Sequence, residues 1–566
     1  MTLLARRTNL ASVSLPLRRC ATLLLAGLSF IGLSAQPVPA QAVAGVGDDA
    51  IPIPRGGTRL TISGLWNDYQ SVFDAAGNKR PLLAPYATSA AGTSLFPQFA
   101  GAEQQIRALT RQSGFQLSLG ALDALGEVRQ SAAPISLEYG LTKRLSIRVV
   151  VPYVESRDIN RLILNAEGTG ANVGINPALA ANGAAARSAN GALTSQIEQA
   201  RTALRAELTR CATSTATNCT VIRANPAGAE ALLDRAATSR ASLIALYGDA
   251  QRAGSPLVPL TGSAQQTAIV ETIRALRTDF AAFGITNIAD NAAPAAATTI
   301  LGPAGIRRIA TDSALGGRYR EIGNTRRAGI GDIDLTATAL LFDSFGADQA
   351  RRLTAATRGV RSTLTGGWRF GTAGADRTED AFDVPIGEGA SAILARSTTD
   401  LILSRSLWVS ATIRGVQPLS DQLYLPVAQP DSLRLAPADR FAMTRSLGRR
   451  LDLEIAPRLA IGQFFGISGA YLHRSWDADR YTPVARATED ARTSPASGST
   501  TPSRTMRAAS VGVTFSTLSG FVRGKSRLPL EVLYTHTEAL GASAAGVPAV
   551  STDRLELRIY TGFPRR

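Results

Sequence analysis

The chain has 566 residues, with 60 lysines and arginines against 44 acids, which gives a formal net charge of +16. It shows no basic module interleaved with aromatic residues, which argues against a nucleic-acid partner. Sparse charge (18% of residues) with 51 glycines suits transmembrane β-structure. Past residue 42, no stretch reaches the roughly 18 uninterrupted apolar residues of a membrane helix.

Residues 1–42 are a predicted secretory signal peptide. Four arginines precede the apolar run of residues 20–35, and the small-residue motif Ala40-Gln41-Ala42 follows. This order of basic, apolar and A-x-A segments is typical of an exported protein, so we expect cleavage near Ala42. A transmembrane anchor is the weaker alternative, because the run is short and is followed by the cleavage motif. Cleavage removes four arginines and no acid, which lowers the formal charge to +12.

After the signal, apolar and polar residues alternate with a period of two in about twelve segments. In the last segment, Leu555, Leu557 and Ile559 alternate with arginines and a glutamate. Such alternation predicts strands with one apolar and one polar face. The segments are 58–71, 113–141, 144–155, 331–343, 357–371, 388–404, 407–418, 441–461, 463–476, 504–517, 527–538 and 551–563.

The connections between these segments differ in length at the two ends. Residues 140–143 and 462–464 are short turns, whereas 72–112 and 477–503 are long loops. Short periplasmic turns and long outer loops are typical of barrels in the bacterial outer membrane. An exported soluble β-sandwich is the alternative, since it also alternates. We expect an all-β transmembrane barrel of about 12 antiparallel strands in the cell outer membrane, in contact with lipid and lipopolysaccharide, with both termini periplasmic.

Residues 156–330 interrupt the barrel segments 43–155 and 331–566 with a helical period. Apolar residues recur every three or four positions in three stripes, and the third begins at Ser263 with a predicted capping box. We therefore expect a large, mainly α-helical insertion between strands 3 and 4, on the outer face. Cys211 and Cys219 flank the turn after the first helix, and in an oxidising compartment we expect them to form a disulfide. The insertion could be a cap, a lumen plug, a partner-binding domain or an ornamented loop.

The closing strand predicts an orientation and a partner. Its apolar stripe is expected to face lipid and its charged stripe the lumen, so Leu557→Arg should be costly and Glu556→Arg mild. An aromatic-ended last strand is also expected to engage the barrel-assembly machinery. Three residues follow Phe563, so that recognition must tolerate a short tail.

The ionisable residues predicted to face the lumen are the remaining candidate site. They could form a network of paired charges that fills a narrow barrel, or they could line a solute pathway. A barrel of this strand number leaves room for a slender pore. The candidates are Arg148, Arg361, Arg369, Arg414, Arg458, Arg558, Asp332, Asp334, Asp452, Glu454 and Glu556.

The sequence offers little catalytic chemistry. The two histidines, His473 and His536, lie near predicted strand ends, and no motif supports Ser468 or Thr535 as a nucleophile beside them. Zinc motifs, a Gly-x-Ser-x-Gly elbow and phosphate-binding glycine loops are absent from the sequence. We therefore expect no enzyme, no cofactor and no metal.

A family resemblance rests on LEYGLTKRLSIRVVVPYV (137–154), GIGDIDLTATALLF (329–342) and GGWRFGTAGADR (366–377). These stretches resemble outer-membrane proteins of the phenol-degradation meta-pathway family, which are barrels of the transporter type. The resemblance covers the barrel and not the insertion, and its motifs mark strands and turns. It implies a channel or transporter for small, hydrophobic or aromatic solutes. The alternative is a surface-binding or structural barrel that displays the helical domain without transport.

Overall fold

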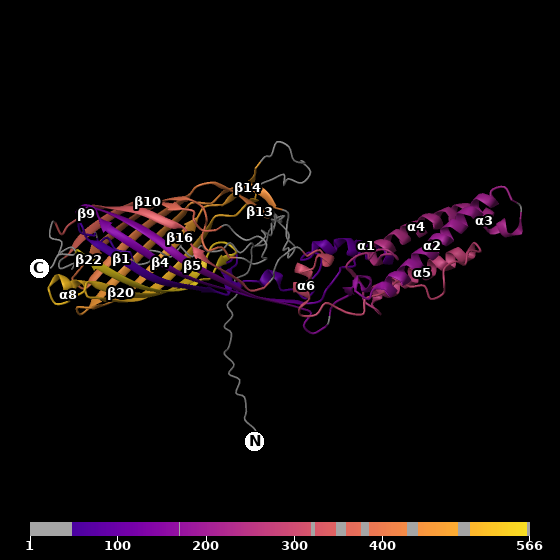
Figure 1. Cartoon of the computed structure of the whole chain (residues 1–566), viewed down its shortest axis with the longest axis horizontal. Coiled ribbons are helices and arrows are strands. Elements are labelled where there is room, and N and C mark those ends of the chain that lie inside the picture. The colour runs from indigo at the N-terminus through magenta and orange to yellow at the C-terminus, as the bar shows by residue number, and fades with distance from the viewer. Residues whose placement is uncertain are drawn as a thin grey trace, which may run out of the picture.

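The computed structural model describes residues 48–562, apart from Pro52, Thr169, Thr215 and the segments 318–322, 347–357, 375–383, 427–439 and 485–498. The predicted signal peptide, its cleavage site and Phe563 lie outside the described residues. A β-barrel occupies one end of the elongated molecule and a group of helices occupies the other (Figure 1).

Twelve strands of the described chain close into an antiparallel barrel, which confirms the predicted fold. Each strand pairs with its neighbour along the chain, and β1 pairs with β22 to complete the ring. β8 and β9 lie end to end along β5 and count as one strand of the wall. The wall consists of β1 (Thr58–Tyr69), β4 (Leu122–Gly140), β5 (Leu145–Leu164), β8 (Thr325–Ile330) with β9 (Ile333–Asp343), β10 (Gly359–Phe370), β11 (Ala392–Ile402), β12 (Leu407–Pro418), β15 (Arg450–Ile461), β16 (Phe465–Trp476), β19 (Arg504–Ser516), β20 (Leu530–Ala542) and β22 (Ser551–Thr561).

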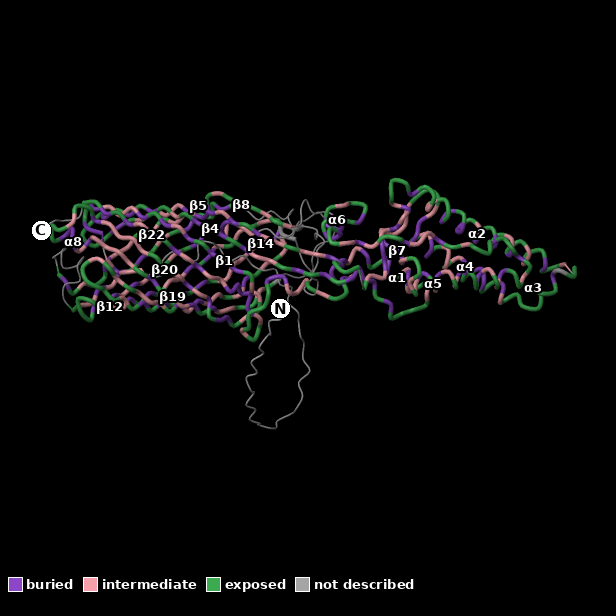
Figure 2. Tube along the Cα trace, turned by 90° about the horizontal axis from the view of Figure 1, so that it is seen from below, coloured by how far each residue is buried: buried purple, intermediate pink, exposed green. Residues whose placement is uncertain are grey.

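Burial alternates along the strands, as Figure 2 shows for the barrel wall. In β22, Arg554, Glu556 and Arg558 are buried, whereas Leu555 and Ile559 are exposed. The charged stripe of this strand therefore faces the inside of the barrel and the apolar stripe faces out. The two termini of the described barrel meet at one rim, because Thr58 pairs with Thr561.

Helices follow at the opposite rim, between β5 and β8. They lie along the long axis of the molecule, beyond the end of the barrel (Figure 1). The segment between β5 and β8 contains α2 (Ala184–Cys211), α3 (Thr220–Ala224), α4 (Pro226–Tyr247), α5 (Ala264–Ala282) and α6 (Gly305–Thr311).

The helical insertion does not complete its own core. Helix α1 (Ala100–Thr110), from the connection between β1 and β4, contributes Ile106 and Leu109 to the same buried cluster as Leu204 of α2 and Ile273 of α5. The Thr272 hydroxyl of α5 also donates a hydrogen bond to the Leu109 carbonyl at 2.8 Å. Two outer connections therefore fold together into one domain.

The start of α5 is held differently from the predicted capping box. The Ser263 hydroxyl oxygen accepts a hydrogen bond from the Gln266 amide at 3.2 Å, as expected for an N-cap. The Gln266 side chain does not return to Ser263; its Oε1 accepts from the Tyr247 hydroxyl at 2.5 Å. Burial raises the pKa of Tyr247, so its hydroxyl stays protonated and continues to donate.

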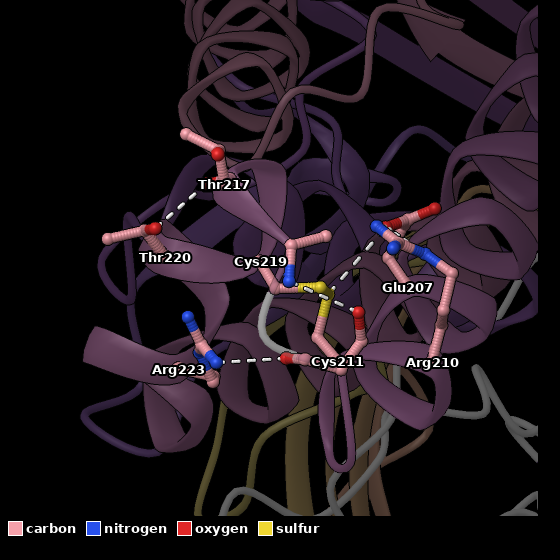
Figure 3. The surroundings of a disulfide bond; sticks show 9 residues. Glu207, Arg210, Cys211, Thr217, Cys219, Thr220 and Arg223 are labelled. Atoms are coloured by element: carbon pink, nitrogen blue, oxygen red, sulfur yellow. Dashed lines mark hydrogen bonds and ion pairs between the residues drawn. A yellow bond between two sulfur atoms is a disulfide. The ribbon is translucent and has the colours of Figure 1, made fainter.

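Cys211 and Cys219 form a disulfide at the turn after α2, with Cα atoms 5.2 Å apart (Figure 3). The same turn is tied by Arg223, which donates to the Ser214 carbonyl at 2.9 Å. Helix α3, which follows Cys219 directly, lies at the end of the helical domain far from the barrel (Figure 1). The disulfide can therefore stabilise the helix tips without touching the barrel wall.

The remaining elements are short and lie in the connections between the wall strands. Among the described helices, none is both long and apolar enough to cross a membrane. These elements are β2 (Ser71–Phe73), β3 (Lys79–Pro81), β6 (Val173–Ile175), β7 (Leu257–Pro259), β13 (Asp421–Pro426), β14 (Arg440–Ser446), β17 (Arg480–Pro483), β18 (Ser499–Thr500), β21 (Val547–Pro548), α8 (Leu518–Val522), and the 3₁₀ turns η2 (Ala84–Tyr86), η3 (Pro97–Phe99), η4 (Pro177–Leu179), η5 (Thr217–Cys219) and η6 (Ser313–Leu315).

Candidate functional site

An apolar belt surrounds the outside of the barrel. Trp66, Ile135 and Tyr153 are 50%, 51% and 54% exposed, although they lie in the middle of paired strands. Along β5, the outward positions are apolar from Leu145 to Tyr153 and become polar at Glu155. This height matches the roughly 9–11 residues that a tilted strand needs to cross a bilayer. Beyond the belt, outward-facing charges pair with one another, as Glu155 does with Arg326 at 3.0 Å.

The inside of the barrel is lined by charges that pair between neighbouring strands. Arg361 and Asp400, both almost fully buried, are joined by a 2.7 Å bond from Nε to Oδ2. Arg474 donates from Nε and Nη2 to the two oxygens of Asp452, each at 2.7 Å. Bidentate arginine–carboxylate pairs of this kind fix strand register as well as charge. Much of the inner charge is therefore structural.

The structure places all the predicted lumen residues on the inner face, and their pairing separates them into groups. Arg369 joins Asp334, Arg414 joins Glu454, and Arg558 joins Glu556. Arg148 faces the lumen and its buried Nε has no hydrogen-bond partner among the described residues. No described residues form a cluster of three or more potential metal ligands. Whether these side chains also serve a solute stays a prediction.

An inner loop, residues 371–374 and 384–391 between β10 and β11, folds into the outer half of the lumen. The Asp332 carboxylate anchors it by accepting hydrogen bonds from the amides of Ala373, Glu388 and Gly389 at 3.0, 2.9 and 3.3 Å. Ile386 packs in a buried cluster with Leu65 of β1, Ala132 of β4 and Val154 of β5. Asp332 is thus the anchor of a loop that narrows the barrel.

An N-terminal segment, residues 48–51, 53 and 54, enters the lumen from the opposite rim. Ile53 packs against Phe521 and Tyr560 at that rim, and the Ala50 amide donates to Asp400 Oδ2 at 2.9 Å deeper inside. The backbone passes so close to Gly140 that a Cβ there would lie 2.1 Å from the Pro54 carbonyl oxygen. Glycine is required at that position for the segment to enter.

Asp48 and Asp49, at the inner end of this segment, meet arginines of the wall. Arg396 Nη1 donates to Asp48 Oδ2 at 2.6 Å, and Arg458 Nη2 donates to the Asp48 carbonyl at 2.8 Å. Arg558 Nη1 donates to Asp49 Oδ2 at 3.3 Å. The N-terminal segment is therefore held in the lumen by these ion pairs as well as by the packing of Ile53 at the rim.

The inner faces of β16, β19, β20, β22, β1 and β4 line a hollow in the outer lumen. About 610 Å³ of space, open solvent included, lies among the side chains of this outer cavity. Trp476 lies at its edge between two guanidinium groups, with Arg474 and Arg504 Cζ at 5.6 and 5.3 Å from its ring centroid. The lining is Asn67, Tyr69, Gln130, Leu472, Arg474, Trp476, Met506, Ala508, Thr537, Ala539, Val550 and Thr552.

Several site residues were missed by sequence reasoning. Arg396 and Arg474 follow the same strand alternation as the predicted lumen residues, so the strand pattern could have found them, whereas Glu388 lies in the inner loop. Asp48 and Asp49 carry no periodic signal; their only clue is an acidic pair soon after the predicted cleavage site in an arginine-rich chain.

The candidate catalytic pairs do not form. Strand alternation places His473 on the outer face of β16 and Ser468 on its inner face. His536 also faces out, on β20, where its Nδ1 lies 2.9 Å from Asp553 Oδ1, whereas Thr535 faces in. Neither histidine can act on the nucleophile considered for it in this arrangement.

Comparison with known proteins shows no family and gives only distant structural similarity. No protein-family model matches the chain, and no curated protein sequence matches it. Among solved structures, an outer membrane channel from Pseudomonas putida F1 is 8% identical, with a TM-score of 0.37 over 91% of this chain and 98% of that one. The CymD monoaromatic hydrocarbon channel is 8% identical, with a TM-score of 0.25 over 91% and 90%. The Pseudomonas putida toluene transporter TodX is 10% identical, with a TM-score of 0.23 over 94% and 95%.

Proposed function

We propose that this chain is an outer-membrane channel for small, partly apolar solutes, aromatic ones included. The observation that carries the proposal is a closed barrel with an apolar belt outside, a polar lumen inside and an outer cavity lined by Tyr69, Leu472 and Trp476. Lipid is the medium in which such a belt is stable, because a water-exposed apolar surface of this extent would aggregate.

The cavity suits a solute with an apolar or aromatic face. Trp476 offers a ring, Leu472 and Met506 offer aliphatic surface, and hydroxyl and amide groups can orient a polar end. The family resemblance and the titles of the structural neighbours agree with this solute class but do not identify a compound. Export by the N-terminal signal, insertion through the last strand by the barrel-assembly machinery, and contact with lipopolysaccharide complete the proposal.

The channel requires the inner loop to move. Asp332 holds this loop by three backbone hydrogen bonds, so Asp332→Ala should free it and raise single-channel conductance in a planar bilayer. Asp123→Ala is the matched control, because Asp123 is exposed on the outer face of β4. Unchanged conductance in Asp332→Ala would contradict the role given to the loop.

The solute class is tested by binding of the apolar fluorophore N-phenyl-1-naphthylamine to refolded protein in detergent. Trp476→Ala should weaken binding several-fold, whereas Trp66→Ala on the lipid-facing wall should not. Separation of envelope membranes should place the chain with the outer membrane. A chain recovered in the soluble periplasm would overturn the proposal. An outer-membrane chain that never conducts, even with the loop freed, would favour the surface-display alternative.

A further inference from the structure

One arginine of the lumen takes its carboxylate partner from outside the wall. Arg361, Arg369 and Arg474 pair with acids on neighbouring strands. Arg396 of β11 instead finds its hydrogen-bond partners, among the described residues, in Asp48 at 2.6 Å and the Thr365 hydroxyl at 3.3 Å. The barrel wall therefore leaves this guanidinium for an anion that comes from elsewhere.

Three further arginines converge on the same two acids from other strands. Arg414 Nε lies 3.5 Å from Asp48 Oδ2, Arg458 Nη1 lies 3.5 Å from Asp49 Oδ2, and Arg558 also contacts Asp49. We call Arg396, Arg414, Arg458 and Arg558 the arginine cluster. The four residues come from β11, β12, β15 and β22, so the cluster surrounds the lumen.

We propose that the arginine cluster is a binding site for a small oxyanion, and that Asp48 and Asp49 occupy it as a tethered stand-in. A guanidinium matches the paired oxygens of a carboxylate or a phosphate, and it stays charged at every physiological pH. The two side-chain carboxylates of the segment thus mark where the oxygens of a free carboxylate or phosphate would sit. Arg148 lies close enough for its charge to act on Asp48, and its unpartnered Nε is a further donor for such an anion.

The stand-in also explains why the cluster is stable without a free ligand. Arg414 and Arg558 also pair with Glu454 and Glu556 of the wall. Lumen cations that lose a counter-charge are destabilised, so an anion beside Arg396 and Arg458 stabilises the site. A tethered group competes at an effective concentration on the order of millimolar. A free anion must therefore outcompete the segment, or bind after the segment has withdrawn toward the rim.

The physiological use of this site rests on the proposed channel function, but its binding chemistry can be measured without conduction. The test uses the full mature chain refolded in detergent, with Asp48→Asn and Asp49→Asn combined. Equilibrium dialysis is run separately with labelled inorganic phosphate and labelled benzoate, which distinguishes phosphate from carboxylate ligands. At least one of the two anions should bind the double variant at least tenfold more tightly than the unaltered chain. The charge-matched control Asp123→Asn with Glu167→Gln, at exposed outer positions, should bind like the unaltered chain.

A second pair of changes tests the location of the site. Adding Arg396→Gln and Arg458→Gln to the double variant should abolish the gained binding. Equal binding by the unaltered chain and the double variant, or binding that survives loss of both arginines, would overturn the proposal.

Displacement of the segment gives a readout that does not depend on the double variant folding. Ala50 is 1% exposed, so a thiol introduced by Ala50→Cys should react slowly with a maleimide. Adding 100 mM phosphate or benzoate should accelerate the reaction at least fivefold, whereas chloride at equal ionic strength should not. A labelling rate that does not change when phosphate or benzoate is added would contradict the role of Asp48 and Asp49 as a tethered stand-in. In bilayers, the double variant should shift the reversal potential toward anion permeability. If no variant conducts ions in bilayers, the result would contradict the channel function. The dialysis result would still decide whether the arginine cluster binds an anion.

Discussion

The buried pair of Arg361 and Asp400 links three wall strands and the N-terminal segment. Asp400 lies on β11 and accepts from Arg361 Nε of β10 at 2.7 Å, from the Ser410 hydroxyl of β12 at 2.7 Å and from the Ala50 amide at 2.9 Å. The two side chains of the pair are 1% and 2% exposed. Replacing Asp400 by asparagine removes one charge and leaves the other buried.

We expect Asp400→Asn to lower the free energy of unfolding by about 3–5 kcal/mol, the usual cost of an uncompensated buried charge. Arg361→Met should lower the free energy of unfolding by a similar amount, because it leaves the buried Asp400 carboxylate without its positive partner. Combining Asp400→Asn with Arg361→Met should cost only about 1–2 kcal/mol, since both charges are then gone. The remaining cost is the loss of hydrogen bonds to Ser410 and Ala50. The two changes should therefore be coupled by at least about 2 kcal/mol.

Reversible urea unfolding in phospholipid vesicles, followed by tryptophan fluorescence, measures these differences. Asp279→Asn is the control, because Asp279 pairs with Arg235 at 2.6 Å on the helical domain with both side chains more than 40% exposed. That exposed pair should contribute less than about 1 kcal/mol. A loss of unfolding free energy below about 1 kcal/mol for Asp400→Asn, or additive effects of the two single changes, would show that Arg361 and Asp400 do not stabilise the barrel as a pair.

Three other outcomes are expected. Leu557→Arg, in the middle of the apolar belt, should cost about 2–4 kcal/mol or block assembly, while Leu125→Arg, which faces out on β4 beyond the belt, should be tolerated; equal effects on heat-modifiable gel mobility would contradict the position of the belt. Paired Cys211→Ser and Cys219→Ser changes should destabilise the helical domain by about 2–3 kcal/mol, seen as an earlier helical transition in circular dichroism, with no change in barrel mobility on gels. Gly140→Ala should push the N-terminal segment outward and speed maleimide labelling in the Ala50→Cys background, whereas Gly366→Ala, where a Cβ meets open space, should not; similar labelling rates would refute the close approach.

The barrel could be predicted because lipid outside and charge inside impose a period of two on every wall strand. The predicted strand at 144–155 is shorter than β5, which ends at Leu164. From Glu155 onward its outward positions mix charged residues with Ile159 and Ile163, because they lie beyond the belt, so the contrast between the two faces disappears while the strand continues to Leu164. Strand pairing with β4 and β8, which no local pattern reports, extends it.

Contacts between distant segments account for the other differences. Helix α1 is short, and its apolar residues are buried only because α4 and α5 cover them, so the sequence indicated a loop. Contacts between side chains of one strand also bear on Glu556→Arg, which was expected to be milder than Leu557→Arg and stays a prediction. Glu556 accepts from Arg554 and Arg558 and is 2% exposed, so a third guanidinium there would remove the carboxylate that these two arginines share.

The path of the N-terminal segment constrains how the protein can be made and labelled. Asp48 lies among side chains from the middle of β11 and β12, inside the lumen. We therefore expect the predicted signal peptide to be cleaved before the last strand pairs with the first, since the apolar run of residues 20–35 is unsuited to a polar lumen. For the same reason, a purification tag is better placed in the turn at 462–464 than at the mature amino terminus.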